Sequence, residues 1–226
     1  MKHKFHNLCI FQKRIINYLM KSIVLVFAKA PISGTVKTRL AFVIGNKKAL
    51  WIYKKLLYKT DSELKKLSQD VVVFYHGGPS TLFKKIFLAF QKKSQLGEDL
   101  GERMQSAFQW GFDKGYEKIL IIGTDLWDLS KPLLENAFKQ LDSNDYVIGP
   151  TSDGGYYLLG CKKFTKHLFT EKKWGSPEVY HQTMKELIGK SVAILDKKND
   201  IDTLEDLEQS PELYNKFKNE FSEREN

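Results

Sequence analysis

The segment "GPTSDGGYYLLG", residues 149–160, places an acid and two glycines between two short apolar runs. Residues 146–150 and 156–160 each have the length and composition of a buried strand. Asp153, Gly154 and Gly155 between them permit two interpretations. They can form an Asp-Gly turn that joins two antiparallel strands. They can also belong to a binding site, because a backbone without a Cβ atom lets a flat ligand approach closely.

Similar apolar runs recur along the chain and alternate with helical patterns. Strands are predicted at residues 22–28, 71–76, 118–123, 146–150, 156–160 and 191–196. Helices are predicted at 46–68, 80–90, 99–114, 131–141 and 177–188, followed by a short capped helix from Thr203 and a charged helix at the end. This alternation is typical of a mainly parallel sheet covered on both faces. No linker or repeat interrupts it, so we expect a single domain over residues 21–226.

Composition narrows the functional class. The chain has 226 residues and a net charge of +9, but acids are interspersed with most of the lysines. The charge is therefore diffuse, and without a nucleic-acid-binding motif we expect no nucleic-acid partner. Cys9 and Cys161 match no metal or redox spacing and are typical of a reducing compartment. No apolar run approaches the ~20 residues of a transmembrane helix, so we expect a cytoplasmic protein without stable membrane insertion.

Residues 1–20 differ from the rest because they contain basic residues and no acid. With "IVLVFA" and "AKA" after them, they superficially resemble a signal peptide. The apolar run is too short for one, so we predict a buried first strand there. We interpret residues 1–20 as an N-terminal extension or a mis-called start, with Met20 as an alternative start.

Ligands of such sheets bind at the carboxyl ends of the strands. The segment "KAPISGTVKTRL", residues 29–40, follows the first strand and carries Lys29, Lys37 and Arg39, with Gly34 allowing a sharp bend. Cations and backbone amides at such a turn can cradle phosphate. It lacks the spacing of a P-loop or a G-x-G-x-x-G loop, and a solvated basic loop remains an alternative.

Carboxylates follow two other strands. Asp125 lies in "GTDLWDLS" after the third strand, and Asp202 lies in the loop after the sixth. Oxygen ligands at this edge can bind Mg²⁺ or Mn²⁺ together with phosphate. Helix capping is the alternative for Asp125, and hydrogen bonding within its own turn is the alternative for Asp202. His76 has no partner at metal-ligand spacing and is interpreted as structural.

Several motifs occur in a fixed order along residues 20–207: "FAKAPISGTVKTRLA", "LGERMQSAF", "GTDLWDL", "GPTSDGGYYLLG", a W-x-x-P-x-V pattern and "DIDTLEDL". Together they resemble a bacterial family of nucleotide-diphospho-sugar transferase-like proteins, which are small, often called glycosyltransferases, and linked to radical-SAM and arsenosugar biosynthesis genes. More distantly, the sequence resembles phospholactate guanylyltransferase and molybdenum-cofactor guanylyltransferase. The family usually has Cys-Pro where this chain has Leu126-Trp127.

The resemblance implies a GT-A, Rossmann-like fold, which is a three-layer α/β/α sandwich with a mixed, mainly parallel sheet. It implies a nucleotide over the first-strand loop, so that Lys29, Lys37 and Arg39 would face phosphates. It also implies that Asp125 fills the metal-binding aspartate position, with Asp202 near the second.

The leading hypothesis is therefore a metal-dependent glycosyltransferase that uses a nucleotide-diphospho-sugar and a small-molecule acceptor. Cations would stabilise the leaving nucleoside diphosphate, and Asp153 would act as the base. Tyr156, Trp174 and Arg103 would line the substrate pocket, although Arg103 can instead pair with a surface carboxylate and one tyrosine can belong to the core. The alternative is a nucleotidyltransferase that acts on a small phosphorylated substrate. The donor, the acceptor and the oligomeric state stay open.

Overall fold

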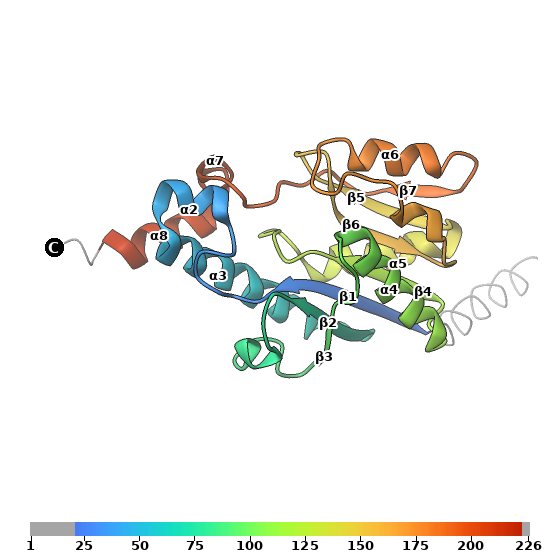
Figure 1. Cartoon of the computed structure of the whole chain (residues 1–226), viewed down its shortest axis with the longest axis horizontal. Coiled ribbons are helices and arrows are strands. Elements are labelled where there is room, and N and C mark those ends of the chain that lie inside the picture. The colour runs from blue at the N-terminus through green and yellow to red at the C-terminus, as the bar shows by residue number, and fades with distance from the viewer. Residues whose placement is uncertain (1–20, 223–226) are drawn as a thin grey trace, which may run out of the picture.

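The computed structural model of the chain describes residues 21–222 and contains a mixed sheet with helices on both faces (Figure 1). The prediction for residues 1–20 lies outside the described residues. The strands are β1 (Ser22–Lys29), β2 (Asp70–His76), β3 (Gln91–Ser94), β4 (Lys118–Ile122), β5 (Tyr146–Pro150), β6 (Tyr156–Cys161) and β7 (Val192–Ile194). The helices are α2 (Thr38–Ile44), α3 (Asn46–Leu64), α4 (Leu100–Asp113), α5 (Lys131–Ser143), α6 (Val179–Glu186), α7 (Leu204–Glu208) and α8 (Pro211–Ser222), with 3₁₀ turns η1 (Ser80–Phe83) and η2 (Lys166–Phe169).

The seven strands lie in the order β3-β2-β1-β4-β6-β5-β7. The neighbours pair in parallel except β6, which is antiparallel to both β4 and β5. Residues 151–155 are too few for the crossover that a parallel neighbour of β5 needs. The predicted mixed, mainly parallel sheet is confirmed, and so is the turn between antiparallel strands.

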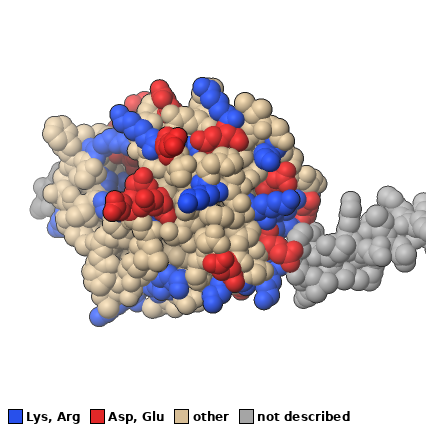
Figure 2. Space-filling model, turned by 45° about the vertical axis from the view of Figure 1, so that its right-hand side comes forward, with Lys and Arg blue, Asp and Glu red and all other residues tan. Residues whose placement is uncertain are grey.

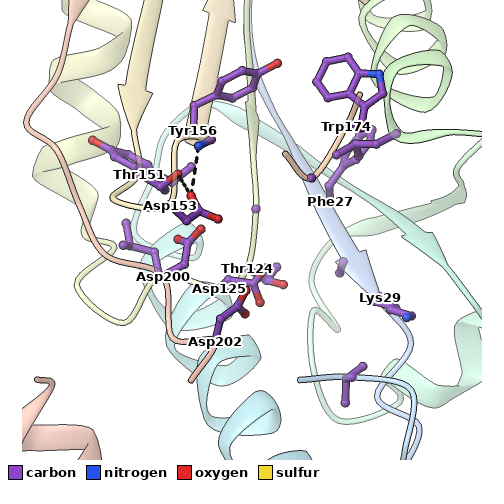
Figure 3. Close-up of a pocket in the computed structure, with 18 of the residues that line it drawn as sticks. Phe27, Lys29, Thr124, Asp125, Thr151, Asp153, Tyr156, Trp174, Asp200 and Asp202 are labelled. Carbon is purple, nitrogen blue, oxygen red and sulfur yellow. Dashed lines mark hydrogen bonds between the residues drawn. The ribbon is translucent and has the colours of Figure 1, made fainter. Parts of the chain in front are cut away.

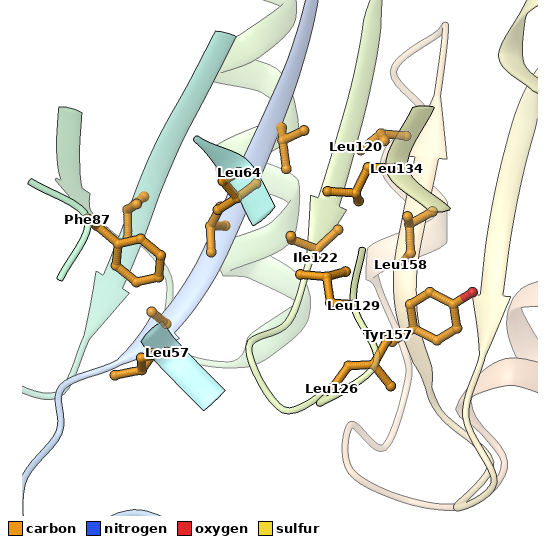
Figure 4. Close-up of a cluster of buried hydrophobic side chains, with 14 of the residues drawn as sticks. Leu57, Leu64, Phe87, Leu120, Ile122, Leu126, Leu129, Leu134, Tyr157 and Leu158 are labelled. Carbon is orange, nitrogen blue, oxygen red and sulfur yellow. The ribbon is translucent and has the colours of Figure 1, made fainter. Parts of the chain in front are cut away.

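Both faces of the sheet are buried. Along β1, Val24 and Val26 belong to the apolar cluster on one face, and Ile23 and Leu25 belong to the cluster on the other, because successive strand residues point to opposite sides. Helices α3 and α5 contribute to the first cluster (Figure 4), and α4 and η2 contribute to the second. The result is the predicted three-layer arrangement.

A third apolar cluster lies beyond the carboxyl end of β1, where α2, α3, α7 and α8 meet (Figure 1). Leu40 of α2, Ile52 of α3 and Leu213 of α8 are fully buried in it. Ile201, just before α7, joins the same cluster. This packing holds the loop after β1 against the loop after β7.

The predicted helix at residues 80–90 is wrong. Only η1 is helical there, Phe87 adopts a left-handed backbone conformation with φ of 57°, and β3 follows. β3 is an edge strand of sequence Gln-Lys-Lys-Ser, so it has no apolar alternation that could have indicated it. Helix α2 was not predicted either, since it buries Leu40 alone and has no apolar stripe.

Glu63 at the end of α3 connects this helix to the start of α5. Its carboxylate accepts hydrogen bonds from the Lys59 and Lys66 ammonium groups at 3.0 and 2.7 Å and from the Lys131 backbone N–H at 3.0 Å. Burial alone would raise the pKa of Glu63, but these bonds outweigh it and lower the pKa to about 2.

Acidic and basic side chains are interspersed on the face in Figure 2, which agrees with the diffuse charge expected from the sequence. Among residues 21–222, no helix combines the length and the apolar character needed to cross a membrane.

Candidate functional site

A cavity of about 530 Å³ opens at the edge of the sheet where β1, β2 and β4 end. The loop after β1, the β5–β6 turn and the loop before α7 complete its wall (Figure 3). Its volume is in the range of small-molecule and cofactor sites. The predicted site residues in its wall are Lys29, Lys37, Arg39, Arg103, Asp125, Asp153, Gly155, Tyr156, Trp174 and Asp202.

Lys37 lies at the centre of the charged side of this cavity. Its ammonium group contacts Asp125 Oδ1 and lies 2.8 Å from Asp202 Oδ1, and its side chain is 3% exposed. Arg39 pairs with the second oxygen of Asp202, Oδ2, at 2.7 Å. Burial would lower the pKa of Lys37, but the two carboxylates outweigh it and raise the pKa, so the ammonium stays charged.

The backbone around these charges is fixed by the fold. Lys37 precedes α2 with φ 49° and ψ 47°, a left-handed conformation that is uncommon for a residue with a side chain. The Ile201 backbone N–H donates to the Asp125 carbonyl at 3.0 Å. This bond holds the loop after β4 against the segment that carries Asp202. The carboxylates of Asp125 and Asp202 therefore lie close enough to contact the same ammonium group.

Asp200 is a fourth carboxyl group in the cavity, and the sequence had not singled it out. Burial raises its pKa to about 8, and the negative charges of Asp125, Asp153 and Asp202 add to the rise while Lys37 opposes it. Figure 3 shows Asp153 and Asp200 turned toward one another. Burial and the neighbouring carboxylates therefore favour the protonated form of Asp200.

Asp153 is both a turn residue and a cavity residue. Its Oδ1 accepts hydrogen bonds from Thr151 Oγ1 at 2.6 Å and from the Gly155 backbone N–H at 3.1 Å. Both bonds use the same oxygen, which leaves Oδ2 available to a ligand. The turn thus orients the predicted base toward the cavity.

A glycine is required at position 154 by the packing of the turn, and not by the approach of a ligand. Its φ is +88°, and a Cβ atom there would lie 2.0 Å from the Pro177 carbonyl oxygen. Its own carbonyl accepts a hydrogen bond from the Tyr180 N–H at 2.9 Å. Neither Gly154 nor Gly34 belongs to the cavity wall, whereas Gly155 does.

Tyr53 of α3 fixes the end of β1. Its hydroxyl accepts a hydrogen bond from the Lys29 N–H at 2.9 Å and donates one to the Lys29 carbonyl at 2.8 Å. The Lys29 ammonium donates to the Thr35 carbonyl at 2.6 Å, which closes the loop after β1 upon itself. Burial, and after it the charge of Asp125, raises the pKa of Tyr53, so the phenol stays neutral.

His76 at the end of β2 also lines the cavity, a position that the sequence analysis did not assign to it. Burial lowers its pKa, and the charges of Arg103 and Lys29 lower it further, so the imidazole is neutral.

Arg103 lies in the cavity wall as predicted, but its guanidinium donates to the carbonyls of Gly97 and Glu98 at 3.0 and 2.9 Å. Within residues 21–222, Arg103 forms no ion pair with a carboxylate, so these two carbonyls take the place of the surface partner that the sequence allowed.

The opposite wall of the cavity is apolar. Figure 3 shows Phe27 beside Trp174, across from the carboxylates. Apolar and aromatic residues that line the cavity include Phe27, Leu100, Met104, Tyr156, Trp174 and Val179. The neighbouring Tyr157 also borders the cavity, but it is buried in the core, and its hydroxyl donates to the Asp196 carbonyl at 3.1 Å. Both tyrosines border the cavity, but they pack against the apolar clusters on opposite faces of the sheet, as strand alternation requires.

Two carboxylates on the charged side of the cavity lie close enough together to share one cation. No group of three or more His, Cys, Asp or Glu side chains at metal-binding distance occurs in residues 21–222. Asp125 and Asp202, however, both reach one nitrogen atom, so both can reach one metal ion. Magnesium is commonly bound by one or two carboxylates, with substrate phosphates and waters as the remaining ligands.

Comparisons with known proteins agree with this architecture. A family profile described as "Uncharacterized protein conserved in bacteria (DUF2064)" matches residues 60–176. The chain belongs to this DUF2064 family. A provisionally named nucleotide-diphospho-sugar transferase from Desulfovibrio desulfuricans is 36% identical over 91% of each chain, with a TM-score of 0.80. No curated protein matches the sequence significantly.

Two more distant structures share the fold of the DUF2064 chain. One is a cytidylyltransferase from Leptospira borgpetersenii, 16% identical over 84% of this chain and 85% of that one, with a TM-score of 0.57. The other is 4-diphosphocytidyl-2C-methyl-D-erythritol synthase from Anaerococcus prevotii, 14% identical over 86% and 99%, with a TM-score of 0.56. The resemblance found in the sequence and the predicted fold are thus confirmed.

Proposed function

We propose that this DUF2064 protein is a transferase that moves a sugar from a nucleotide-diphospho-sugar to a small-molecule acceptor, with Mg²⁺ or Mn²⁺. One observation carries the proposal: the cations of the loop after β1 and a pair of carboxylates meet around one point of a nucleotide-sized cavity. That arrangement suits a metal-bound diphosphate. The similarity to the Desulfovibrio protein, whose name is a nucleotide-diphospho-sugar transferase, supports it.

In this proposal, Lys37 and Arg39 face the diphosphate, where negative charge accumulates as the sugar bond breaks. Preorganised cations that meet this charge favour the transition state over the ground state. Asp125 and Asp202 hold the divalent metal, which supplies further neutralisation of the leaving group. Tyr53 acts indirectly, since it holds the backbone of Lys29 at the end of β1.

The acceptor enters between Asp153 and the apolar wall. Asp153 Oδ2 receives the proton of the attacking hydroxyl, while Oδ1 stays bonded within the turn. Phe27 and Trp174 contact the less polar face of the bound molecule, because aromatic rings bind sugar and base rings in this way.

The second candidate is nucleotidyl transfer, in which a phosphorylated substrate attacks the α-phosphate of a nucleoside triphosphate and releases pyrophosphate. The number of cations at the cavity favours it, since Lys29, Lys37, Arg39 and Arg103 suffice for a triphosphate. The shared fold with cytidylyltransferases is compatible with it.

A thermal-shift screen separates these candidates. The panel contains nucleoside triphosphates, nucleoside diphosphates and their sugar conjugates, each with and without Mn²⁺. A ligand that binds the native state alone raises the melting temperature. Stabilisation by one diphospho-sugar that exceeds the effect of the triphosphate supports sugar transfer, and the reverse order supports nucleotidyl transfer.

Asp125→Asn is the control for the metal, because it keeps the shape of the side chain and removes its charge. We expect this variant to lose the metal-dependent part of the shift. If no nucleotide stabilises the protein, or if Asp125→Asn keeps the full metal effect, the proposed function or its metal assignment is wrong.

A further inference from the structure

The position that a divalent metal would take between Asp125 and Asp202 already holds a cation, the ammonium group of Lys37. This group contacts Asp125 Oδ1 and lies 2.8 Å from Asp202 Oδ1. The Lys37 side chain is 3% exposed, whereas the two carboxylate side chains are 42% and 31% exposed. A ligand entering from the cavity can therefore reach the carboxylates while the ammonium lies beneath them.

Both oxygens of Asp202 are engaged in ion pairs. Oδ1 pairs with Lys37 and Oδ2 pairs with Arg39 at 2.7 Å. A bare metal ion that binds either oxygen of Asp202 would lie close to the ammonium of Lys37 or the guanidinium of Arg39, and the positive charges would repel it. The ion would also add positive charge to a partly buried site in which Lys37 and Arg39 already pair with the two carboxylates.

A nucleotide diphosphate changes this balance. Its phosphate oxygens complete the coordination that two carboxylates leave unfinished, because Mg²⁺ and Mn²⁺ bind through few protein ligands where phosphates are available. The same phosphates offer a new partner to the displaced ammonium of Lys37. The negative charge of the phosphates then offsets the positive charge that the metal adds beside Lys37 and Arg39.

The backbone of Lys37 is suited to such an exchange. Its left-handed conformation, with φ 49° and ψ 47°, sets the start of α2, and this helix has no side-chain cap. Leu40, one turn further on, is fully buried in the third apolar cluster. The base of the Lys37 side chain is therefore fixed, and its ammonium can move by rotation of the side chain alone.

We propose that Lys37 is the resident cation of the metal site, which excludes the bare ion and admits the metal only as a metal–phosphate chelate. This inference rests on the proposed function, because it concerns the same metal site. It adds that the metal and the nucleotide bind together as one complex. As this complex binds, the Lys37 ammonium exchanges its contacts with the carboxylates for contacts with the phosphates.

Binding of Mn²⁺ to the nucleotide-free protein tests the inference. Free Mn²⁺ is measured by electron paramagnetic resonance with wild type and with Lys37→Met, which removes the charge and keeps most of the side-chain volume. We expect Lys37→Met to bind the bare ion at least tenfold more tightly than wild type. Adding Asp125→Asn to Lys37→Met should abolish the gain.

Lys118→Met is the matched control. Lys118 is 5% exposed and pairs with Asp142, which is 31% exposed, at the opposite end of β4. This variant also loses a buried lysine from an ion pair, but it should leave Mn²⁺ binding at the wild-type level. Equal Mn²⁺ affinity of wild type and Lys37→Met would overturn the inference.

A second measurement needs no variant, in case Lys37→Met does not fold. Wild type is titrated calorimetrically with Mn²⁺ alone and with preformed Mn²⁺–pyrophosphate. Tighter binding of the chelate supports the inference, and binding of the bare ion as tight as that of the chelate overturns it. Neither experiment uses a nucleotide, so a positive result stands even if the nucleotide screen fails, and a negative result leaves the nucleotide screen to judge the transferase proposal.

Discussion

Replacing Gly154 with alanine tests the structural role assigned to the β5–β6 turn. The new Cβ would lie 2.0 Å from the Pro177 carbonyl oxygen, and that oxygen belongs to backbone that no side-chain rotation can move. Relief requires the turn to shift away from Pro177, which breaks the 2.9 Å hydrogen bond from the Tyr180 N–H to the Gly154 carbonyl. Alanine must also adopt a φ near +88°.

The positive φ, the overlap and the lost hydrogen bond together predict a loss of roughly 3–6 kcal/mol in the free energy of unfolding. Gly115→Ala is the matched control, because Gly115 has φ of +79° with no atom within 4 Å of its added Cβ. It should lose only about 1–2 kcal/mol, the cost of the backbone conformation. Equilibrium urea unfolding measures both, and equal losses in the two variants would refute the argument.

Three further predictions concern single side chains. The pKa of Glu63 is lowered from 4.5 to about 2, so its contribution to stability is present above pH 4.5 and disappears as the pH falls toward 2. Glu63→Gln should therefore destabilise the protein at pH 7 and not near pH 2, as followed by urea unfolding across pH. Tyr53→Phe removes both hydrogen bonds to Lys29 and should cost about 1–3 kcal/mol together with weaker nucleotide binding; unchanged affinity in a calorimetric titration would contradict its role. Asp99→Ala removes the cap that accepts from the Glu102 N–H at 2.8 Å and should lower the free energy of unfolding by about 1 kcal/mol, whereas Asp99→Ser should recover most of that loss.

The sequence predicted the edge of the site better than its interior. Strand ends are readable from apolar runs, and the ligand edge of a parallel sheet follows from them, which is why Lys29, Asp125 and Asp202 were located correctly. What each side chain contacts was not readable. Lys37 pairs with carboxylates that lie far along the chain, and nothing local indicates this.

Other residues were missed for particular physical reasons. Tyr53 occupies a position on the apolar stripe of α3, where any large residue suggests core packing, and its hydroxyl contact depends on tertiary structure. Asp200 resembles any loop acid until burial raises its pKa. His76 directly ends β2, so the rule applied to the other strands would have found it. Edge strand β3 has no apolar pattern at all.

The reversed direction of β6 has a consequence for how such proteins can diversify. Because β6 starts where β4 and β5 end, the turn that joins β5 to β6 lies at the ligand edge without belonging to any crossover helix. A side chain of this turn such as Asp153 can therefore be exchanged while Gly154 keeps its contact with Pro177 and the sheet keeps its register. The loop after β1, which carries the cations, is a separate segment. Under the proposed function, these separate stretches of sequence would recognise the acceptor and the donor, and evolution could change the first without rebuilding the second.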